Sequence, residues 1–137
     1  MAIKVRLQES KFREENRANR WYLRTVSQGE VSTEALAEHI ERDTSFTRGD
    51  VRGLIYALVD EMQLQLQQGK TVVLDDFGRF YLSVESHAKP SPKDFNLKES
   101  VKNVKCKFVP SGNQKNKLRR KIDHFGNGVE VEWYDAE

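Results

Sequence analysis

The chain has 137 residues, of which 37% are hydrophobic and 32% are charged, and its formal net charge is +2. This length predicts one domain with small terminal additions, and so small an apolar fraction predicts a core that oligomerisation completes. The single cysteine, Cys106, excludes an intramolecular disulfide framework. The sequence contains no run of about 18 apolar residues to cross a membrane, and its first residues lack the apolar centre of a signal peptide. We therefore expect a soluble cytoplasmic protein.

The charge is distributed unevenly along the chain. Residues 98–121 contain nine Lys or Arg residues and one acidic residue, whereas residues 123–137 contain five acidic residues and no Lys or Arg. A block as basic as the first favours a polyanionic partner, and a solvated basic surface is the alternative explanation.

The first 30 residues predict a small β extension. Residues 1–8 alternate between apolar and polar side chains, which is the period of a strand, and residues 20–27 are rich in β-prone side chains. The polar residues 9–19 between them predict a loop. Gln28 and Gly29 predict the turn that ends the extension.

Two helices are predicted next. The first covers residues 33–43 and has Ser32 as its N-cap. The second covers residues 48–68, begins with Thr47 and Asp50 at capping-box spacing, and is about 30 Å long. Its apolar stripe consists of Val51, Leu54, Ile55, Leu58, Val59, Met62 and Leu66. The first helix is too short to cover this stripe, so we predict that a second copy of the long helix covers it. A helix-turn-helix motif is the less favoured interpretation, because the long helix carries few side chains suited to base contacts.

Helical periodicity changes to strand periodicity over residues 69–84, which read GKTVVLDDFGRFYLSV. Gly69 ends the long helix as a C′ residue. An apolar run, the aromatic step Phe77-Gly78-Arg79-Phe80 and strict alternation follow. Residues 86–100 lose the alternation and contain two prolines, which predicts an excursion from the sheet.

Alternation returns over residues 101–109, where Cys106 falls on the apolar face and is expected to be a small buried hydrophobe. A turn at 110–112 precedes a short basic helix predicted over residues 113–123. A final strand is predicted from Val129, and its glutamates complement the basic Lys4 and Arg6 of the first strand. We therefore predict that the two terminal strands pair.

No catalytic arrangement is evident in the sequence. The three histidines are far apart and have no metal-ligand spacing with each other or with the cysteine. Neither a Gly-rich phosphate loop nor a nucleophile elbow is present, and the carboxylate pair Asp75-Asp76 stands where a solvated bend is expected. We expect no enzymatic activity, no metal, no cofactor and no small-molecule substrate.

The order of these elements resembles that of the bacterial HU/IHF family of histone-like DNA-binding proteins. The resemblance covers about Val31 to Ile122, and its most specific part runs from Gly69-Lys70 through Phe77-Gly78-Arg79-Phe80, followed by Phe108 with Pro110. The remaining ends are similar to a longer HU-related branch with an N-terminal extension. The resemblance implies an HU-like domain over residues 31–122 with an arm at about 85–104. Outside it, the residue patterns predict an N-terminal β extension over residues 1–30 and an acidic C-terminal tail or strand over residues 123–137.

The implied fold is α+β. It is an intertwined homodimer with a helical base, a three-stranded antiparallel sheet, a β-arm and extra terminal strands. The implied dimer core contains Leu54, Leu58, Met62, Phe77, Phe80 and Phe108. The implied partner is double-stranded DNA in the nucleoid, bound with low sequence specificity, condensed and bent by prolines at the arm tips.

Charge, facing and the resemblance together indicate the residues that contact DNA. They are Arg79, Lys89, Pro90, Pro92, Lys93, Lys98, Lys102, Lys105, Lys107, Lys115, Lys117, Arg119, Arg120 and Lys121. The arm departs from the family's usual R-N-P tip, and acidic residues lie among its lysines. These departures favour the alternative hypothesis, a dimeric scaffold of the same fold for protein–protein contacts with weak or no DNA binding.

Overall fold

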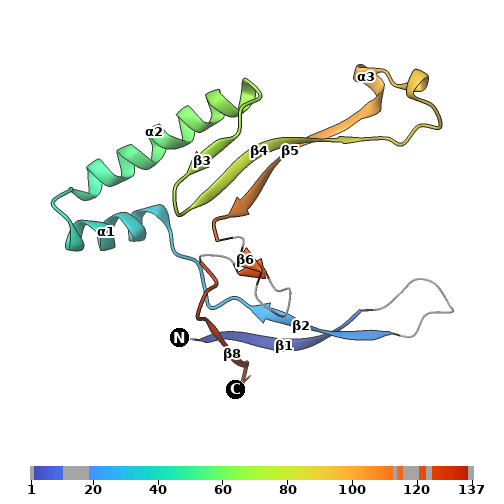
Figure 1. Ribbon diagram of the computed structural model, residues 1–137. Coiled ribbons are helices and arrows are strands. Elements are labelled where there is room, and N and C mark those ends of the chain that lie inside the picture. Colours follow the sequence, from blue (N-terminus) through green and yellow to red (C-terminus); the bar gives the residue numbers. More distant parts are fainter. Residues whose placement is uncertain (1, 11–18, 113, 116–120, 123–124, 136–137) are drawn as a thin grey trace. The chain divides into compact units, whose positions relative to one another are not determined.

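A computed structural model describes residues 2–10, 19–112, 114–115, 121–122 and 125–135. The chain divides into two compact units (Figure 1). The terminal unit combines residues 1–36 with residues 128–137, and the central unit comprises residues 37–127.

The terminal unit is a three-stranded sheet of β1 (Ala2–Ser10), β2 (Arg20–Val26) and β8 (Glu130–Trp133) in the order β2-β1-β8. β1 is antiparallel to β2 and parallel to β8. The predicted pairing of the terminal strands is confirmed, and Lys4 lies opposite Glu132 and forms an ion pair with it.

The expectation that Arg6 also meets a glutamate is wrong. β8 pairs with β1 only as far as Val5, so Arg6 lies beyond the last paired residue of β8. Its cross-strand partner is Arg24 of β2, another cation. Pairing register therefore decides which of the two basic residues is neutralised.

The sheet of the terminal unit has one apolar face and one polar face, because side chains alternate along each strand. The apolar face contains Ile3, Val5, Leu7, Trp21, Leu23, Val131 and Trp133. Val5 is buried, and the other six side chains are exposed.

The helices of the chain have the predicted caps. α1 (Thr33–Asp43) begins after Ser32, whose hydroxyl accepts a hydrogen bond from the Ala35 N–H. α2 (Arg48–Gln67) begins with the predicted capping box: the Thr47 hydroxyl accepts from the Asp50 N–H, and the Asp50 carboxylate accepts from both the backbone N–H and the hydroxyl of Thr47. These hydrogen bonds lower the pKa of Asp50 below its usual value.

The end of α2 is a Schellman motif. Gly69 has a φ of 81°, its N–H donates to the Leu66 carbonyl, and the Lys70 N–H donates to the Gln65 carbonyl. The glycine directs the chain from the helix into β3 (Val72–Leu74), the first strand of the central sheet.

The central sheet has the order β3-β4-β5 and is antiparallel throughout, with β4 at Gly78–Ser86 and β5 at Val101–Pro110. Gly78 has a φ of 151°, and a Cβ atom there would lie 2.5 Å from the Val109 carbonyl oxygen and 2.6 Å from the Phe108 ring. Glycine is therefore required where β4 begins.

Aromatic rings gather beside this glycine. Phe80 stacks on Phe108 with ring centroids 4.7 Å apart, and Phe77 lies 5.9 Å from each of these two rings. Phe125 contacts Phe77 edge-on at 5.7 Å. The aromatic cluster that the resemblance implied is confirmed, and Phe125 is an addition to it.

The predicted basic helix over residues 113–123 is wrong at the positions that the structure describes. Residues 114–115 form β6 (Gln114–Lys115), residues 121–122 form β7 (Lys121–Ile122), and the two strands pair antiparallel. A helix would have placed like charges four residues apart, Lys115 with Arg119 and Lys117 with Lys121, which destabilises a helix.

Much of the apolar stripe of α2 is exposed in the single chain. Val51 and Leu66 are buried near its ends, but Leu54 is 60% exposed and Leu58 42% exposed. Phe77 and Phe108 of the implied dimer core are also exposed, whereas Met62 and Phe80 are half-buried. The sequence-based expectation that α1 leaves this stripe uncovered is therefore confirmed.

Candidate nucleic-acid interface

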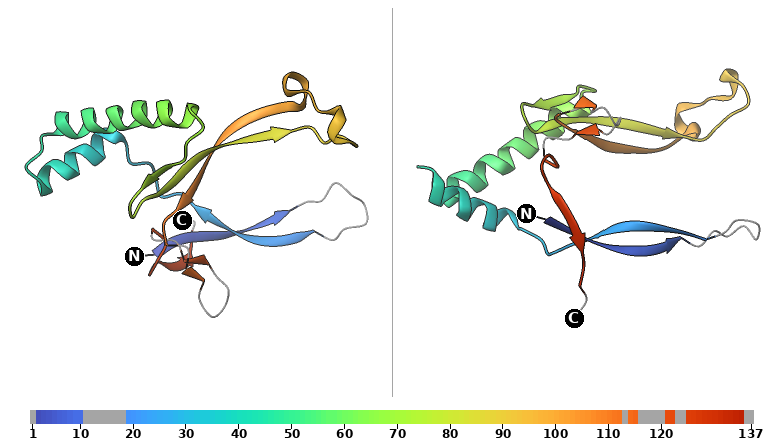
Figure 2. Two further views of the ribbon diagram at one scale, coloured as in Figure 1. Left: turned by 45° about the horizontal axis from the view of Figure 1, so that its top comes forward. Right: turned by 60° about the horizontal axis from the view of Figure 1, so that its bottom comes forward.

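Strands β4 and β5 form a ribbon that extends to a folded tip, the turn region of residues 87–100 (Figure 2). Their register gives the ribbon two different faces. One face pairs Phe80 with Phe108, Leu82 with Cys106, and Val84 with Val104. The other face is polar and contains Arg79, Tyr81, Ser83, Glu85, Asn103, Lys105 and Lys107. This second face is called the arm face below.

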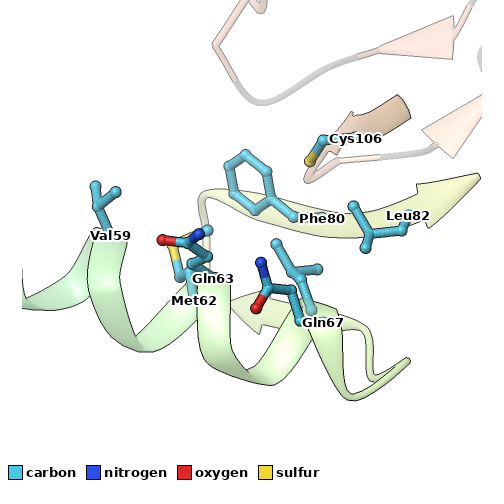
Figure 3. Close-up of a pocket in the computed structure, with 8 residues that line it drawn as sticks. Val59, Met62, Gln63, Gln67, Phe80, Leu82 and Cys106 are labelled. Carbon is cyan, nitrogen blue, oxygen red and sulfur yellow. The ribbon is translucent and has the colours of Figure 1, made fainter. Parts of the chain in front are cut away.

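The apolar face of the ribbon lies against α2. Val59, Met62 and Leu66 of the helix line an open pocket together with Phe80, Leu82 and Cys106 of the two strands (Figure 3). Because this pocket is open, Cys106 is exposed, and the expectation that it is buried is wrong for the single chain. The arm face is the opposite side of the same strands, so its cations point away from this pocket.

The three predicted cations on the arm face differ in their surroundings. Lys105 donates to the Glu85 carboxylate at 2.6 Å, from the neighbouring strand. Arg79 and Lys107 are exposed, and neither forms an ion pair among the residues that the structure describes. Arg79 and Lys107 therefore carry the uncompensated positive charge of the arm face, whereas Glu85 already partly neutralises Lys105.

The tip contains two short helical turns that the sequence analysis missed. Ser91 caps the 3-10 turn η1 (Pro92–Asp94), and Asn96 caps α3 (Leu97–Ser100), each by accepting from a backbone N–H two residues on. The signal was present in the sequence, because Ser before Pro and Asn before an apolar residue are N-cap patterns.

A buried serine holds the tip together. Ser100 is only 3% exposed, its hydroxyl accepts from the Asn96 N–H at 2.9 Å, and its carbonyl accepts from the His87 N–H at 2.9 Å. The second bond joins the two sides of the turn region where β4 ends and β5 begins. The tip is therefore a folded cap on the ribbon.

The predicted tip residues remain on the surface within this cap. Lys89, Pro90, Pro92, Lys93 and Lys98 are all exposed. Pro92 occupies the first position of η1, where the fixed φ of proline favours a helical start. Leu97 is 86% exposed, and the neighbouring Phe95 is also exposed.

Lys102 lies at an irregularity in the β4–β5 ladder. Glu85 pairs with Asn103 and Ser86 pairs with Val101, so Lys102 has no residue opposite it. A bulge of this kind bends a ribbon and increases its twist. Lys102 is exposed and lies between the arm face and the tip.

The remaining predicted cations follow β5. Lys115 and Lys121 are cross-strand partners in the β6–β7 pair. Lys117, Arg119 and Arg120 lie outside the described residues, so their DNA contacts stay predictions. Within the described ranges, no group of three or more His, Cys, Asp and Glu residues is arranged to hold a metal ion.

The arrangement of two helices, a three-stranded antiparallel sheet and a ribbon is compatible with an HU-type domain. A family model described as an HU domain fused to wHTH, Ig, or a glycine-rich motif matches residues 1–125. The chain belongs to this family. The matched range includes the β1–β2 hairpin of the terminal unit. A search of curated proteins finds no match, and none of the described helices is both long and apolar enough to cross a membrane.

Proposed function

We propose that this protein is an architectural DNA-binding protein of the nucleoid that acts as a homodimer with low sequence specificity. The dimer is supported by the exposed apolar stripe of α2. Leu54 and Leu58 lie one turn apart on the solvent side of the helix, and exposing such a stripe costs about 25 cal/mol for each Å² of apolar surface. A second copy of the same stripe is a matching cover.

The arm face carries the DNA-binding proposal. Arg79 and Lys107 are exposed on the face of the ribbon directed away from α2 and form no ion pair with any residue that the structure describes, and the tip adds three exposed lysines. Binding driven by phosphate neutralisation needs exposed cations and no particular base contacts, which accounts for low sequence specificity.

A gel shift with duplex DNA tests this proposal. We expect Arg79→Gln with Lys107→Gln to weaken binding at about 50 mM salt and to reduce the slope of log K against log salt by about 1.8, since each lost phosphate contact is worth about 0.9. Lys105→Gln is the matched control and should have a smaller effect, because Glu85 already partly neutralises that charge. No duplex binding by the unchanged protein at this salt concentration would contradict the proposal.

The second candidate function is a dimeric scaffold for protein–protein contacts. The folded tip favours it, because an exposed leucine and an exposed phenylalanine flank the N-cap Asn96 and are suited to an apolar partner surface. Leu97→Ser separates the two functions. A scaffold that uses the tip loses its partner with this variant, whereas phosphate binding by the arm face is unchanged.

A further inference from the structure

The β1–β2 hairpin of the terminal unit has a polar face that the proposed function does not use. Beyond the end of β8, this face contains Arg6, Gln8, Ser10, Arg20, Tyr22 and Arg24. We call it the hairpin face. Glu9, the one acidic residue in residues 6–10 and 20–24, is paired with Trp21 on the opposite face.

Two of the arginines are direct cross-strand partners. Arg6 lies opposite Arg24, and like charges in this position destabilise a sheet. Neither arginine, nor Arg20, forms an ion pair within the part of the chain that the structure describes, and all three are exposed. Lys4, two residues before Arg6 on the same face, is neutralised by Glu132. The charge of the hairpin face is thus concentrated where β8 no longer covers the edge of β1.

An exposed aromatic ring lies within this charge. Tyr22 is 48% exposed and stands between Arg20 and Arg24 on alternate positions of β2. Alternate residues of a strand are about 6.7 Å apart, so the three side chains form a row of cation, ring and cation. Gln8, Ser10, Tyr22 and Arg24 of this face also line a hollow, to which Glu9 contributes from the edge although its position in the strand belongs to the opposite face.

We propose that the hairpin face binds single-stranded nucleic acid, with Arg6, Arg20 and Arg24 on the phosphates and Tyr22 stacked against a base. Arginines alone would suit any phosphate chain. The Tyr22 ring favours a single strand over a duplex. The unpaired bases of a single strand expose the faces that stack on aromatic side chains, whereas a duplex keeps those faces covered. An anionic strand between Arg6 and Arg24 also removes the repulsion between them.

The test uses the full chain, a fluorescent oligothymidylate and a duplex of equal length, with binding followed by anisotropy. We expect Arg6→Gln with Arg24→Gln to weaken single-strand binding at least tenfold and to reduce the log–log salt slope by about 1.4, at about 0.7 for each contact in a single strand. Lys89→Gln with Lys93→Gln removes the same charge from the tip of the central unit and is the matched control. An equal loss in both double variants would overturn the proposal.

Tyr22 separates stacking from charge. We expect Tyr22→Ala to weaken single-strand binding about tenfold, and Tyr22→Phe, which keeps the ring, to restore most of it. Duplex binding through the arm face should change little in either variant. If Tyr22→Ala leaves single-strand binding unchanged, or if it weakens duplex binding as much, the hairpin face has no stacking role and the proposal is wrong.

Thermal melting distinguishes a binding role from a structural one. Because Arg6 and Arg24 repel each other, the double glutamine variant should melt at the same temperature as the unchanged protein or higher. A lower melting temperature would show that the two arginines support the sheet, and that result would also overturn the proposal. The outcome does not depend on the arm face, so failure of duplex binding and failure of single-strand binding are read separately.

Discussion

The two ribbons of this protein, β1–β2 and β4–β5, have the same design but use it differently. Each is an antiparallel pair with one apolar face and one basic face. In β4–β5, a glutamate on one strand neutralises Lys105 on the other. In β1–β2, Arg6 lies opposite another arginine, Arg24. The glutamate on this face, Glu132, forms its ion pair with Lys4 instead. From amino-acid composition alone, the basic faces of the two ribbons would be expected to present similar charge to a partner. Register shows that the excess charge lies at Arg79 and Lys107 on one ribbon and at the arginine pair on the other.

The largest expected effect on stability is at Gly78, where β4 begins and its backbone lies close to the Val109 carbonyl and the Phe108 ring of β5. Gly78→Ala should destabilise the protein by about 3 kcal/mol or more, because the added Cβ would overlap the Val109 carbonyl and the Phe108 ring and because φ is positive. Chemical denaturation followed by circular dichroism measures this. Gly53→Ala is the control: it lies within α2 with nothing close to its Cβ, and should stabilise by up to about 1 kcal/mol. Equal effects of the two variants would contradict the close approach.

The tip of β4–β5 should depend on one hydroxyl. Ser100→Ala leaves the part-buried Asn96 N–H without its side-chain acceptor, which costs about 0.5–1.5 kcal/mol. We expect faster hydrogen exchange and easier proteolysis over residues 87–100 and an almost unchanged melting temperature. Ser83→Ala on the arm face is the control. Exchange that stays slow after Ser100→Ala would show that the two caps hold the tip alone.

The sheet of the terminal unit should respond oppositely to the same substitution at two neighbouring positions. Lys4→Glu places a carboxylate opposite Glu132 and should lower stability by a few tenths to about 1 kcal/mol. Arg6→Glu places a carboxylate opposite Arg24 and should raise stability by a similar amount. Thermal melting of both variants at low salt checks the register. A fall in both melting temperatures would contradict it.

The smallest expected effect concerns the N-terminal cap of α2, which lies outside both ribbons and therefore serves as a comparison for them. Hydrogen bonds from Thr47 lower the pKa of Asp50. A carboxyl group whose pKa is lower in the folded state stabilises the fold above its unfolded pKa, and the contribution is lost as the pH falls through its folded pKa. The stability of the unchanged protein should therefore drop in acid below the usual range of aspartate. Asp50→Asn should remove this part of the pH dependence. An unchanged pH profile would contradict the assignment.

Sequence patterns predicted the helices well and the ribbon tip poorly. The bounds of α1 agree with the prediction, and those of α2 differ by one residue at its end, because caps and helical spacing are interactions between residues three or four positions apart. The tip depends on Ser100, whose carbonyl accepts a hydrogen bond from the His87 N–H across the turn region, between residues much farther apart in the sequence than those of a cap. The basic segment after Pro110 was predicted as a helix, and its described residues are strands.

The sequence by itself determined the order of the elements from β1 to β4, the caps of α1 and α2, the turn at Gly69, the F-G-x-F step and the uncovered stripe that predicts a second copy. These features depend on local spacing and on hydrophobic period. Only the tertiary structure decided that β8 runs parallel to β1, that Arg6 meets Arg24, and that Lys105 meets Glu85. These are questions of register between strands distant in the sequence, where a shift of one residue exchanges the two faces. For this reason the charge of the two ribbons was visible in the sequence, but the cations that remain free for a partner were not.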